Sequence, residues 1–286
     1  MKKSVKKRSK IKHKSKQRKS PTKLRRSIKS KHKSKRKKST KKSKVKSKKK
    51  IQQNITRKES NDLYRMMKYV HDTFVKHGIN YWMCGGNLLG IVRSGNKLLL
   101  NDDDLDICIM KNDVPKLKKL VSFFKKDGYD LTNEKDDEES DSDEEEGGKK
   151  CLTVKNSCSF YVEKNEGSLG LDIFVMVKKN NIVTYADPHW EEADNGGKKC
   201  YFLYEHLYPL TPRKLGNFYV YTPSNIIPHL NSCYGVSWNH MIQTLYNHKK
   251  QKWINSKPRE MDSKDFFGIK PPKDTEDLVP PELIVK

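Results

Sequence analysis

The most informative part of the chain is a run of thirty residues in which a glycine pair and four aspartates separate apolar segments. Residues 81–110 read YWMCGGNLLGIVRSGNKLLLNDDDLDICIM. The apolar residues at 79–84 predict a short buried strand that ends at the glycine pair, and residues 87–93 predict a short helix. A second strand is predicted to begin near residue 98, to carry the aspartates and to continue to Met110.

The aspartates of this second strand form the first candidate site. Alternate side chains of a strand point to the same face, so Asp104 and Asp106 are predicted to project together. Asp102 joins them if the extended geometry begins early enough. Carboxylates held this close repel one another, and Mg²⁺ or Mn²⁺ stabilises such a group because these ions prefer hard oxygen ligands. We therefore predict that Asp104 and Asp106 bind metal, with Asp102 as a further candidate.

A third carboxylate stands in a strongly apolar run, LGLDIFV at residues 169–175. An acid inside a buried strand is costly unless it is ligated or paired, so Asp172 also points to a site. If its strand lies beside the strand of Asp104, the three acids converge as two-metal phosphoryl transfer requires. Catalytic and metal-binding roles are accordingly predicted for Asp104, Asp106 and Asp172, with Mg²⁺ or Mn²⁺ as cofactor.

The glycine pair offers a place for the substrate. A glycine pair before a helix lets the backbone approach a phosphate, and the helix N-terminus favours an anion. We therefore predict substrate or phosphate binding at Gly85, Gly86 and Asn87. Each feature alone has an ordinary alternative, because glycine pairs form turns and Asp-x-Asp occurs in solvated loops. An EF-hand loop is disfavoured, since Ile107 stands where that loop requires glycine.

In this order, the motifs resemble the LicD/fukutin family of the polymerase-β-like nucleotidyltransferase superfamily. The resemblance is carried by a glycine pair with a Leu-Leu-Gly-x-x-Arg helix, an Asp-rich strand and a later strand with one acid, which are residues 85–93, 102–106 and 171–174. Similar residues follow at 207–210, 218–220, Pro223, Leu230 and Tyr234-Gly235-x-x-Trp238. The resemblance spans roughly residues 63 to 238.

The resemblance implies a metal-dependent transferase that moves a phospho-alcohol group, of the phosphocholine or ribitol-phosphate type. The donor would be CDP-linked and the acceptor a glycan hydroxyl. The resemblance also implies that Arg93 contacts a phosphate, although an arginine on a short helix is equally compatible with a surface cation. The chain departs from the family pattern at Asn87, Ser94 and Asn101, which replace a small hydroxyl residue, a frequent histidine and a tryptophan. These departures bear on the identity of the donor more than on the reaction type.

The order of elements predicts an α/β fold of the α+β type, a mixed β-sheet flanked by helices, and the resemblance implies that this sheet is nucleotidyltransferase-like. We predict a disordered basic tail over 1–56, a catalytic domain over 57–255 and a proline-containing C-terminal arm over 256–286. Residues 133–149 are predicted to be a disordered acidic insertion, because ten Asp or Glu residues lie between Glu134 and Glu146.

Local signals place further elements. A helix is predicted from Ser60 or Asn61 to a cap at Gly78. Asp113 is a candidate N-cap for a helix through Phe124, and Pro223 is suited to start a helix through Leu230. Further strands are predicted at 152–154, 160–162, 169–177, 182–185 and 217–221.

The positive charge of the chain is concentrated in its first fifty residues. They contain 28 of the 61 Lys and Arg residues and no Asp or Glu. The remaining residues hold 33 basic and 35 acidic side chains, so they are nearly neutral. A tail of this kind binds nucleic acid or another polyanion nonspecifically, or serves solubility or nuclear targeting. Sequence-specific recognition is disfavoured because no aromatic residues are interleaved.

The six cysteines are scattered without a C-x-x-C pair, which favours reduced, buried thiols and a cytoplasmic-type reducing compartment. No run of 18 apolar residues is present, so no transmembrane segment is expected. Two other functions stay open on the sequence alone. One is nucleotidyl transfer to RNA or to a small molecule, and the other is a non-catalytic polyanion-binding protein with a degenerate transferase domain.

Overall fold

The computed structural model describes residues 55–100, 102–133, 159–164, 169–187, 200–242, 245–247, 252–254, 257–263 and 265–285. Almost all of the predicted basic tail and acidic insertion, and the strand predicted at 152–154, lie outside these ranges. Three residues at the margins of the predicted tail and of the predicted insertion belong to the folded part instead. Ile55 is buried, Thr56 caps the first helix, and Asn133 is the last residue of strand β4 (Tyr129–Asn133).

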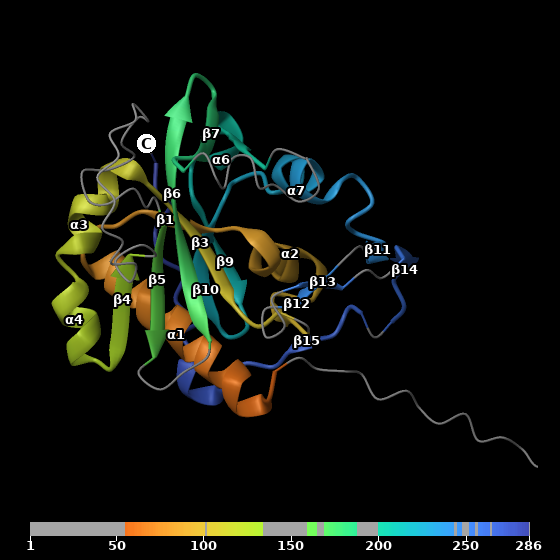
Figure 1. Ribbon diagram of the computed structural model, residues 1–286, viewed down its shortest axis with the longest axis horizontal. Helices are drawn as coiled ribbons and strands as arrows, with labels where there is room; N and C mark the ends of the chain where they lie inside the picture. Colours follow the sequence, from red (N-terminus) through yellow and green to blue (C-terminus); the bar gives the residue numbers. More distant parts are fainter. Residues whose placement is uncertain are drawn as a thin grey trace, which may run out of the picture. The chain divides into compact units, whose positions relative to one another are not determined.

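A seven-stranded mixed sheet forms the centre of the fold (Figure 1). Its strands other than β4 are β1 (Tyr81–Met83), β3 (Leu105–Met110), β5 (Ser159–Lys164), β6 (Gly170–Lys179), β7 (Ile182–Tyr185) and β8 (Phe202–Leu203). The order is β1-β3-β6-β5-β4, and β7 pairs with both β6 and β8. Within this sheet β3 and β6 run parallel, whereas the other described pairs run antiparallel. The predicted mixed sheet flanked by helices is confirmed.

The first helix, α1 (Arg57–Lys76), packs against the sheet through the apolar positions that its periodicity predicts. Leu63, Met67, Val70 and Phe74 are fully buried. The helix begins three to four residues before the predicted start, because Thr56 and Glu59 form a capping box that satisfies the first free N–H groups. Gly78 follows the helix with φ +64°, as the predicted cap requires.

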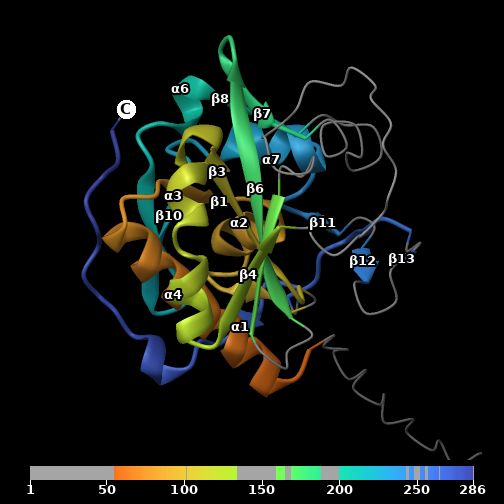
Figure 2. The same ribbon diagram turned by 60° about the vertical axis from the view of Figure 1, so that its left-hand side comes forward.

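Two short helices, α3 (Val114–Lys118) and α4 (Val121–Lys126), follow β3 and a 3₁₀ turn, η1 (Lys111–Asp113). They lie on the same side of the sheet as α1 (Figure 2). The prediction of one continuous helix capped by Asp113 was wrong. The Asp113 side chain makes no capping hydrogen bond and instead accepts one from Lys116 Nζ at 2.9 Å.

The connection from β1 to β3 contains α2 (Gly85–Arg93) and β2 (Leu98–Leu99). Later in the chain, α6 (Tyr204–Leu207) follows β8. A hairpin of β9 (Thr211–Leu215) and β10 (Phe218–Thr222) leads to α7 (Ile227–Tyr234). The helix predicted to start at Pro223 starts four residues later, with Pro228 in its first turn. Pro228 meets the same requirement, because a proline in the first turn loses no helical hydrogen bond. None of the helices in the described residues is long and apolar enough to cross a membrane.

The C-terminal residues pack along the fold through short pairings. Two small ladders join β11 (Met241–Ile242) to β14 (Arg259–Glu260) and β12 (Leu245–Asn247) to β13 (Lys252–Ile254). Strand β15 (Gly268–Ile269) pairs with β2, and the turn η3 (Lys273–Thr275) follows. Ile269 is buried and its carbonyl accepts a hydrogen bond from the buried Tyr64 hydroxyl at 2.6 Å. This segment therefore contributes a side chain to the core.

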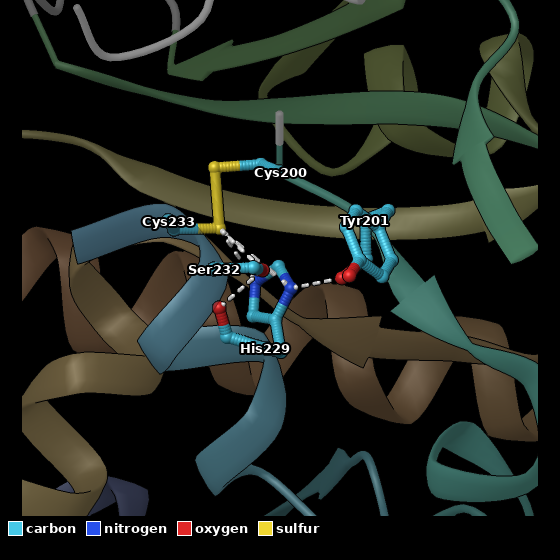
Figure 3. Close-up of a disulfide and its surroundings, with 5 residues drawn as sticks. All are labelled: Cys200, Tyr201, His229, Ser232 and Cys233. Atoms are coloured by element: carbon cyan, nitrogen blue, oxygen red, sulfur yellow. Dashed lines mark hydrogen bonds between the residues drawn. A yellow bond between two sulfur atoms is a disulfide. The ribbon is translucent and has the colours of Figure 1, made fainter. Parts of the chain in front are cut away.

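Cys200 and Cys233 form a disulfide that links the residues before β8 to α7 (Figure 3). The expectation of reduced thiols was therefore wrong for this pair, because the fold brings together two cysteines 33 positions apart. The His229 ring lies beside Cys233, approaches the Tyr201 carbonyl at 2.9 Å and stacks on Phe202. Cys84 and Cys108 are free and buried.

Candidate metal centre

The three predicted acids come together on one face of the sheet. Asp106 is the second residue of β3, Asp172 is the third residue of β6, and the two are direct partners in the parallel ladder. Asp104 lies just before β3. Each of the three offers a carboxylate oxygen, and these oxygens lie within 4.8 Å of one another. The predicted pairing of the two acid-bearing strands is confirmed, and the resulting cluster is one that could hold a divalent cation.

The alternation of side chains explains why the acids share a face. Leu105 and Ile107 of β3, and Leu171 and Ile173 of β6, are fully buried on the other face. The carboxylates are half-buried, so some solvent reaches them. Burial, then the charges of Asp104 and Asp172, raises the pKa of Asp106 well above its ordinary value. A cation bound by the three oxygens would offset this repulsion, which is the chemical reason that the residues fit Mg²⁺ or Mn²⁺.

Asp102 lies beside the cluster without belonging to the group of three. Its Oδ2 accepts a hydrogen bond from Asn87 Nδ2 at 3.1 Å. Burial, then the charge of Asp104, raises the pKa of Asp102 well above its ordinary value. A metal-binding role for Asp102 stays a prediction.

Asn87 is fully buried, and its amide holds the segment that carries the acids. Besides Asp102, its Nδ2 donates to the Asp104 carbonyl at 3.2 Å, and its Oδ1 accepts from the Asp106 backbone N–H. The Asn87 amide thereby contacts three of the acidic residues from within α2. These contacts connect the glycine-pair helix to the acid-bearing strand.

The glycine pair makes room for the carboxylates. Helix α2 begins at Gly85, which adopts φ +55°, a conformation that favours glycine. A Cβ atom at Gly85 would lie 2.0 Å from Asp106 Oδ2, and one at Gly86 would lie 2.7 Å from Asp102 Oδ2. A side chain at either position would displace an acid, so the glycines are required by close packing whatever their role toward a phosphate.

Arg93 ends α2 and is half-buried. Its Nη1 donates to the Trp238 carbonyl at 3.1 Å, and its buried Nε has no hydrogen-bond partner among the described residues. Burial lowers the pKa of Arg93, while Tyr234, Asp265 and Asp102 act in the opposite direction. The Arg93 guanidinium is thus partly withdrawn from solvent, unlike a freely exposed surface cation.

Sequence reasoning missed Tyr161, which lies on β5 as the direct partner of Asp172. Burial, then the charges of Asp172, Glu163 and Asp104, raises the pKa of Tyr161 to about 12. The polar and apolar alternation in SFYVE over 159–163 could have placed Tyr161 on the polar face. Its closeness to Asp172 depends on the pairing of β5 with β6, which the alternation within one strand does not predict.

Tyr234, at the end of α7, is a second tyrosine near the acids. Tyr234 is partly buried against the core. Burial, followed by Asp106 and Asp102, raises its pKa. Its surroundings therefore include both the core and the acidic cluster.

Comparisons with known proteins agree with this architecture. Residues 78–225 match the family described as "LicD/FKTN/FKRP, nucleotidyltransferase domain". Two relatives are the uncharacterized proteins RP689 of Rickettsia prowazekii (strain Madrid E) and RT0683 of Rickettsia typhi (strain ATCC VR-144 / Wilmington). Each is 32% identical over 181 residues, which are 63% of this chain and 56% and 48% of the respective relative. The chain thus spans about half the length of these relatives. The family match covers the glycine pair, the acid-bearing strands and Asp172, and the chain belongs to the LicD family of nucleotidyltransferase-fold proteins.

Proposed function

We propose that the protein is a metal-dependent transferase that moves a phospho-alcohol group from a CDP-linked donor to a glycan hydroxyl. The group would be of the phosphocholine or ribitol-phosphate type. The observation that carries the proposal is the convergence of Asp104, Asp106 and Asp172, whose oxygens lie within 4.8 Å of one another. Membership of the LicD family supports a transferase, and the choice of donor and acceptor is our inference.

In this proposal Asp104, Asp106 and Asp172 would hold Mg²⁺ or Mn²⁺, with Asp102 as a further candidate ligand. The bound ions would supply activation of the acceptor hydroxyl and stabilisation of charge on the leaving nucleotide. The acceptor oxygen bonds to the phosphorus that carries the alcohol, and the bond from this phosphorus to the diphosphate bridging oxygen breaks. CMP leaves with the bonding electrons, and the proton of the acceptor hydroxyl passes to solvent.

The remaining site residues act on the donor and on the acids. Gly85 and Gly86 allow the backbone at the start of α2 to approach the diphosphate, where a helix N-terminus favours an anion. Arg93 would contact a phosphate oxygen through its partly buried guanidinium. Asn87, whose amide is used by Asp102, Asp104 and Asp106, would position the acids rather than recognise a substrate group by itself.

The test is a turnover assay on the full-length protein with CDP-choline and CDP-ribitol as donors and Mg²⁺ or Mn²⁺ present. Release of CMP supports phospho-alcohol transfer, whereas release of pyrophosphate from a nucleoside triphosphate would support nucleotidyl transfer instead. Asp104→Ala and Asp106→Ala are expected to abolish the release. Unimpaired turnover in these variants would overturn the mechanism.

The basic tail has its own proposal, contact with a polyanion through residues 1–50. Deletion of the tail is expected to remove salt-dependent binding to heparin or RNA and to leave CMP release unchanged. A protein that binds polyanions through its tail, but shows no metal or nucleotide affinity, would be the non-catalytic alternative.

A further inference from the structure

The acidic cluster has two different sides, defined by the order of the strands. Strand β3 lies between β1 and β6, and β5 lies on the far side of β6. The start of α2 follows β1, and Gly85 is packed against Asp106. Across the sheet the order is therefore Gly85, Asp106, Asp172 and Tyr161, because Asp106 pairs with Asp172 and Asp172 pairs with Tyr161.

The side chain of Tyr161 extends over Gly170, the residue two positions before Asp172 on the same face of β6. A Cβ atom at Gly170 would lie 1.9 Å from Tyr161 Cζ and 2.0 Å from its hydroxyl oxygen. The absence of a side chain at Gly170 thus leaves the space that the phenol fills. Leu171 pairs with Leu105 of β3, and Gly170 and Asp104 are the residues that precede this pair. The phenol, which covers Gly170, therefore lies in the direction of Asp104 as well as Asp172.

The phenol is chemically suited to bind a hydroxylated ligand. Tyr161 is half-buried, and no hydrogen bond of its hydroxyl is found within the described part of the chain. A phenol with an ordinary pKa near 10 is protonated at neutral pH, so it can donate to an alcohol oxygen. Its ring offers an apolar surface beside that donor.

We propose that Tyr161 binds the acceptor and that polyol hydroxyls enter the site from the β5 side. This inference rests on the proposed function. In phosphoryl transfer the attacking and leaving oxygens lie roughly in line on opposite sides of the phosphorus. The donor diphosphate lies at the glycine pair, at one end of the order across the sheet. The attacking hydroxyl therefore occupies the opposite end of this order, next to Tyr161. The phenol donates to an acceptor oxygen beside the attacking one and so selects a polyol over water.

The experiment measures how the reaction divides between a polyol and water. Full-length protein is given CDP-choline or CDP-ribitol with Mn²⁺, and glycerol or a methyl hexoside as acceptor. Total CMP release counts both reactions, and the phosphodiester product counts transfer alone. Tyr161→Phe is expected to lower the ratio of transfer to hydrolysis roughly three- to tenfold, the loss of one hydrogen bond. Hydrolysis is expected to fall less than transfer, because water needs no such contact.

Two further variants separate this role from a structural one. Gly170→Ala is expected to lower the same ratio, because its Cβ would displace the phenol. In a Tyr161→Ala background Gly170→Ala has no phenol to displace, so no further loss is expected. Tyr129→Phe is the matched control. It removes a phenol hydroxyl from β4, where Tyr129 stacks on Tyr69 of α1.

The outcomes distinguish this inference from the function on which it rests. If the wild-type protein releases CMP and transfers to a polyol, but Tyr161→Phe keeps the wild-type ratio, the inference is overturned and the function stands. Equal loss of hydrolysis and transfer in Tyr161→Phe also overturns it, because that result describes damage to the whole site. A wild type that hydrolyses the donor but transfers to neither polyol overturns the assignment to polyol acceptors. No CMP release from either donor overturns the function and the inference together.

Discussion

The two faces of strands β3 and β6 share one backbone but differ in chemistry. On one face Leu105, Ile107, Leu171 and Ile173 are fully buried. On the other, Asp106 and Asp172 stand side by side with Asp104 within reach of the same ion. The apolar face stabilises the fold by burial, whereas the acidic face costs stability unless its charge is offset. Neighbouring residues of one strand should therefore affect stability and activity separately.

The largest expected effect is at Asp106, on the acidic face. Asp106→Asn is expected to lower CMP release on the order of a thousandfold, because a ligand of the proposed ion is lost. The same change should not lower the melting temperature in EDTA, because an uncharged amide replaces a carboxylate that burial and its neighbours disfavour. Turnover and thermal melting measure the two effects.

The control for this prediction is Asp130→Asn, which alters a carboxylate on β4, two strands beyond β6. Its turnover and melting temperature should match those of the wild type. A large loss of melting temperature in Asp106→Asn would show that the acidic face stabilises the fold, and the contrast between the faces would fail.

The next effect is on the apolar face of β6. Ile173 is fully buried and adjacent to Asp172, so Ile173→Ala is expected to cost about 2–5 kcal/mol of unfolding free energy. Turnover per folded molecule should stay within roughly twofold, because the acids are unchanged. Urea denaturation and the CMP assay at low temperature test this. Lost turnover at unchanged stability would contradict it.

A smaller effect is expected where α2 meets the acidic face. Asn87→Ala removes the amide that contacts Asp102, Asp104 and the Asp106 N–H, so Mn²⁺ affinity should fall about 10- to 100-fold. Asn87→Ser keeps a small polar group, so its Mn²⁺ affinity should lie between that of Asn87→Ala and that of the wild type. Calorimetric Mn²⁺ titration measures the affinity. Wild-type affinity in Asn87→Ala would remove its positioning role.

The smallest expected effect is on the pH dependence of stability, and it comes from the side of the sheet that α1 covers. Burial lowers the pKa of His71, on α1, from 6.5 to about 4. Between these values the unfolded chain binds a proton that the folded protein excludes, so stability falls as the pH falls from 6.5 to 4. His71 should contribute about 1.4 kcal/mol per pH unit in this window. His71→Gln should reduce the slope of unfolding free energy against pH by that amount.

Part of that slope should survive the substitution, because burial also lowers the pKa of His229 to about 4. An identical slope in His71→Gln and the wild type would show that His71 does not titrate as its burial requires. The comparison is made in EDTA at constant ionic strength, so that metal binding does not contribute.

The sequence predicted the parts of the site that depend on neighbouring residues. Alternation placed Asp104 and Asp106 on one face, and an acid in an apolar run singled out Asp172. The periodicity from Leu63 to Phe74 predicts the helix, whereas its start is set by the capping box of Thr56 and Glu59, which precedes the apolar repeat. The two short helices after Asp113 replace the single predicted helix because the chain makes a turn at Lys119 and Leu120, whose N–H groups bond three residues back. Such a tight turn leaves no strong mark in the sequence.

Other features depend on which segments meet. Strand β15 pairs with β2 across about 170 positions of sequence, and Cys200 meets Cys233 through the packing of α7. Tyr161 lies beside Asp172 because β5 pairs with β6 in one register rather than another. A shift of that register by one residue would turn Tyr161 to the other face.

The sequence by itself therefore determined which chemical groups are present and which face of a strand they share, since residue identity and local periodicity state both. The tertiary structure alone decided that Asp106 and Asp172 are partners, that the glycine pair lies against the acids and that Tyr161 flanks them. The physical reason is that side-chain direction is set within a strand, whereas the distance between strands is set by hydrogen bonding between distant segments.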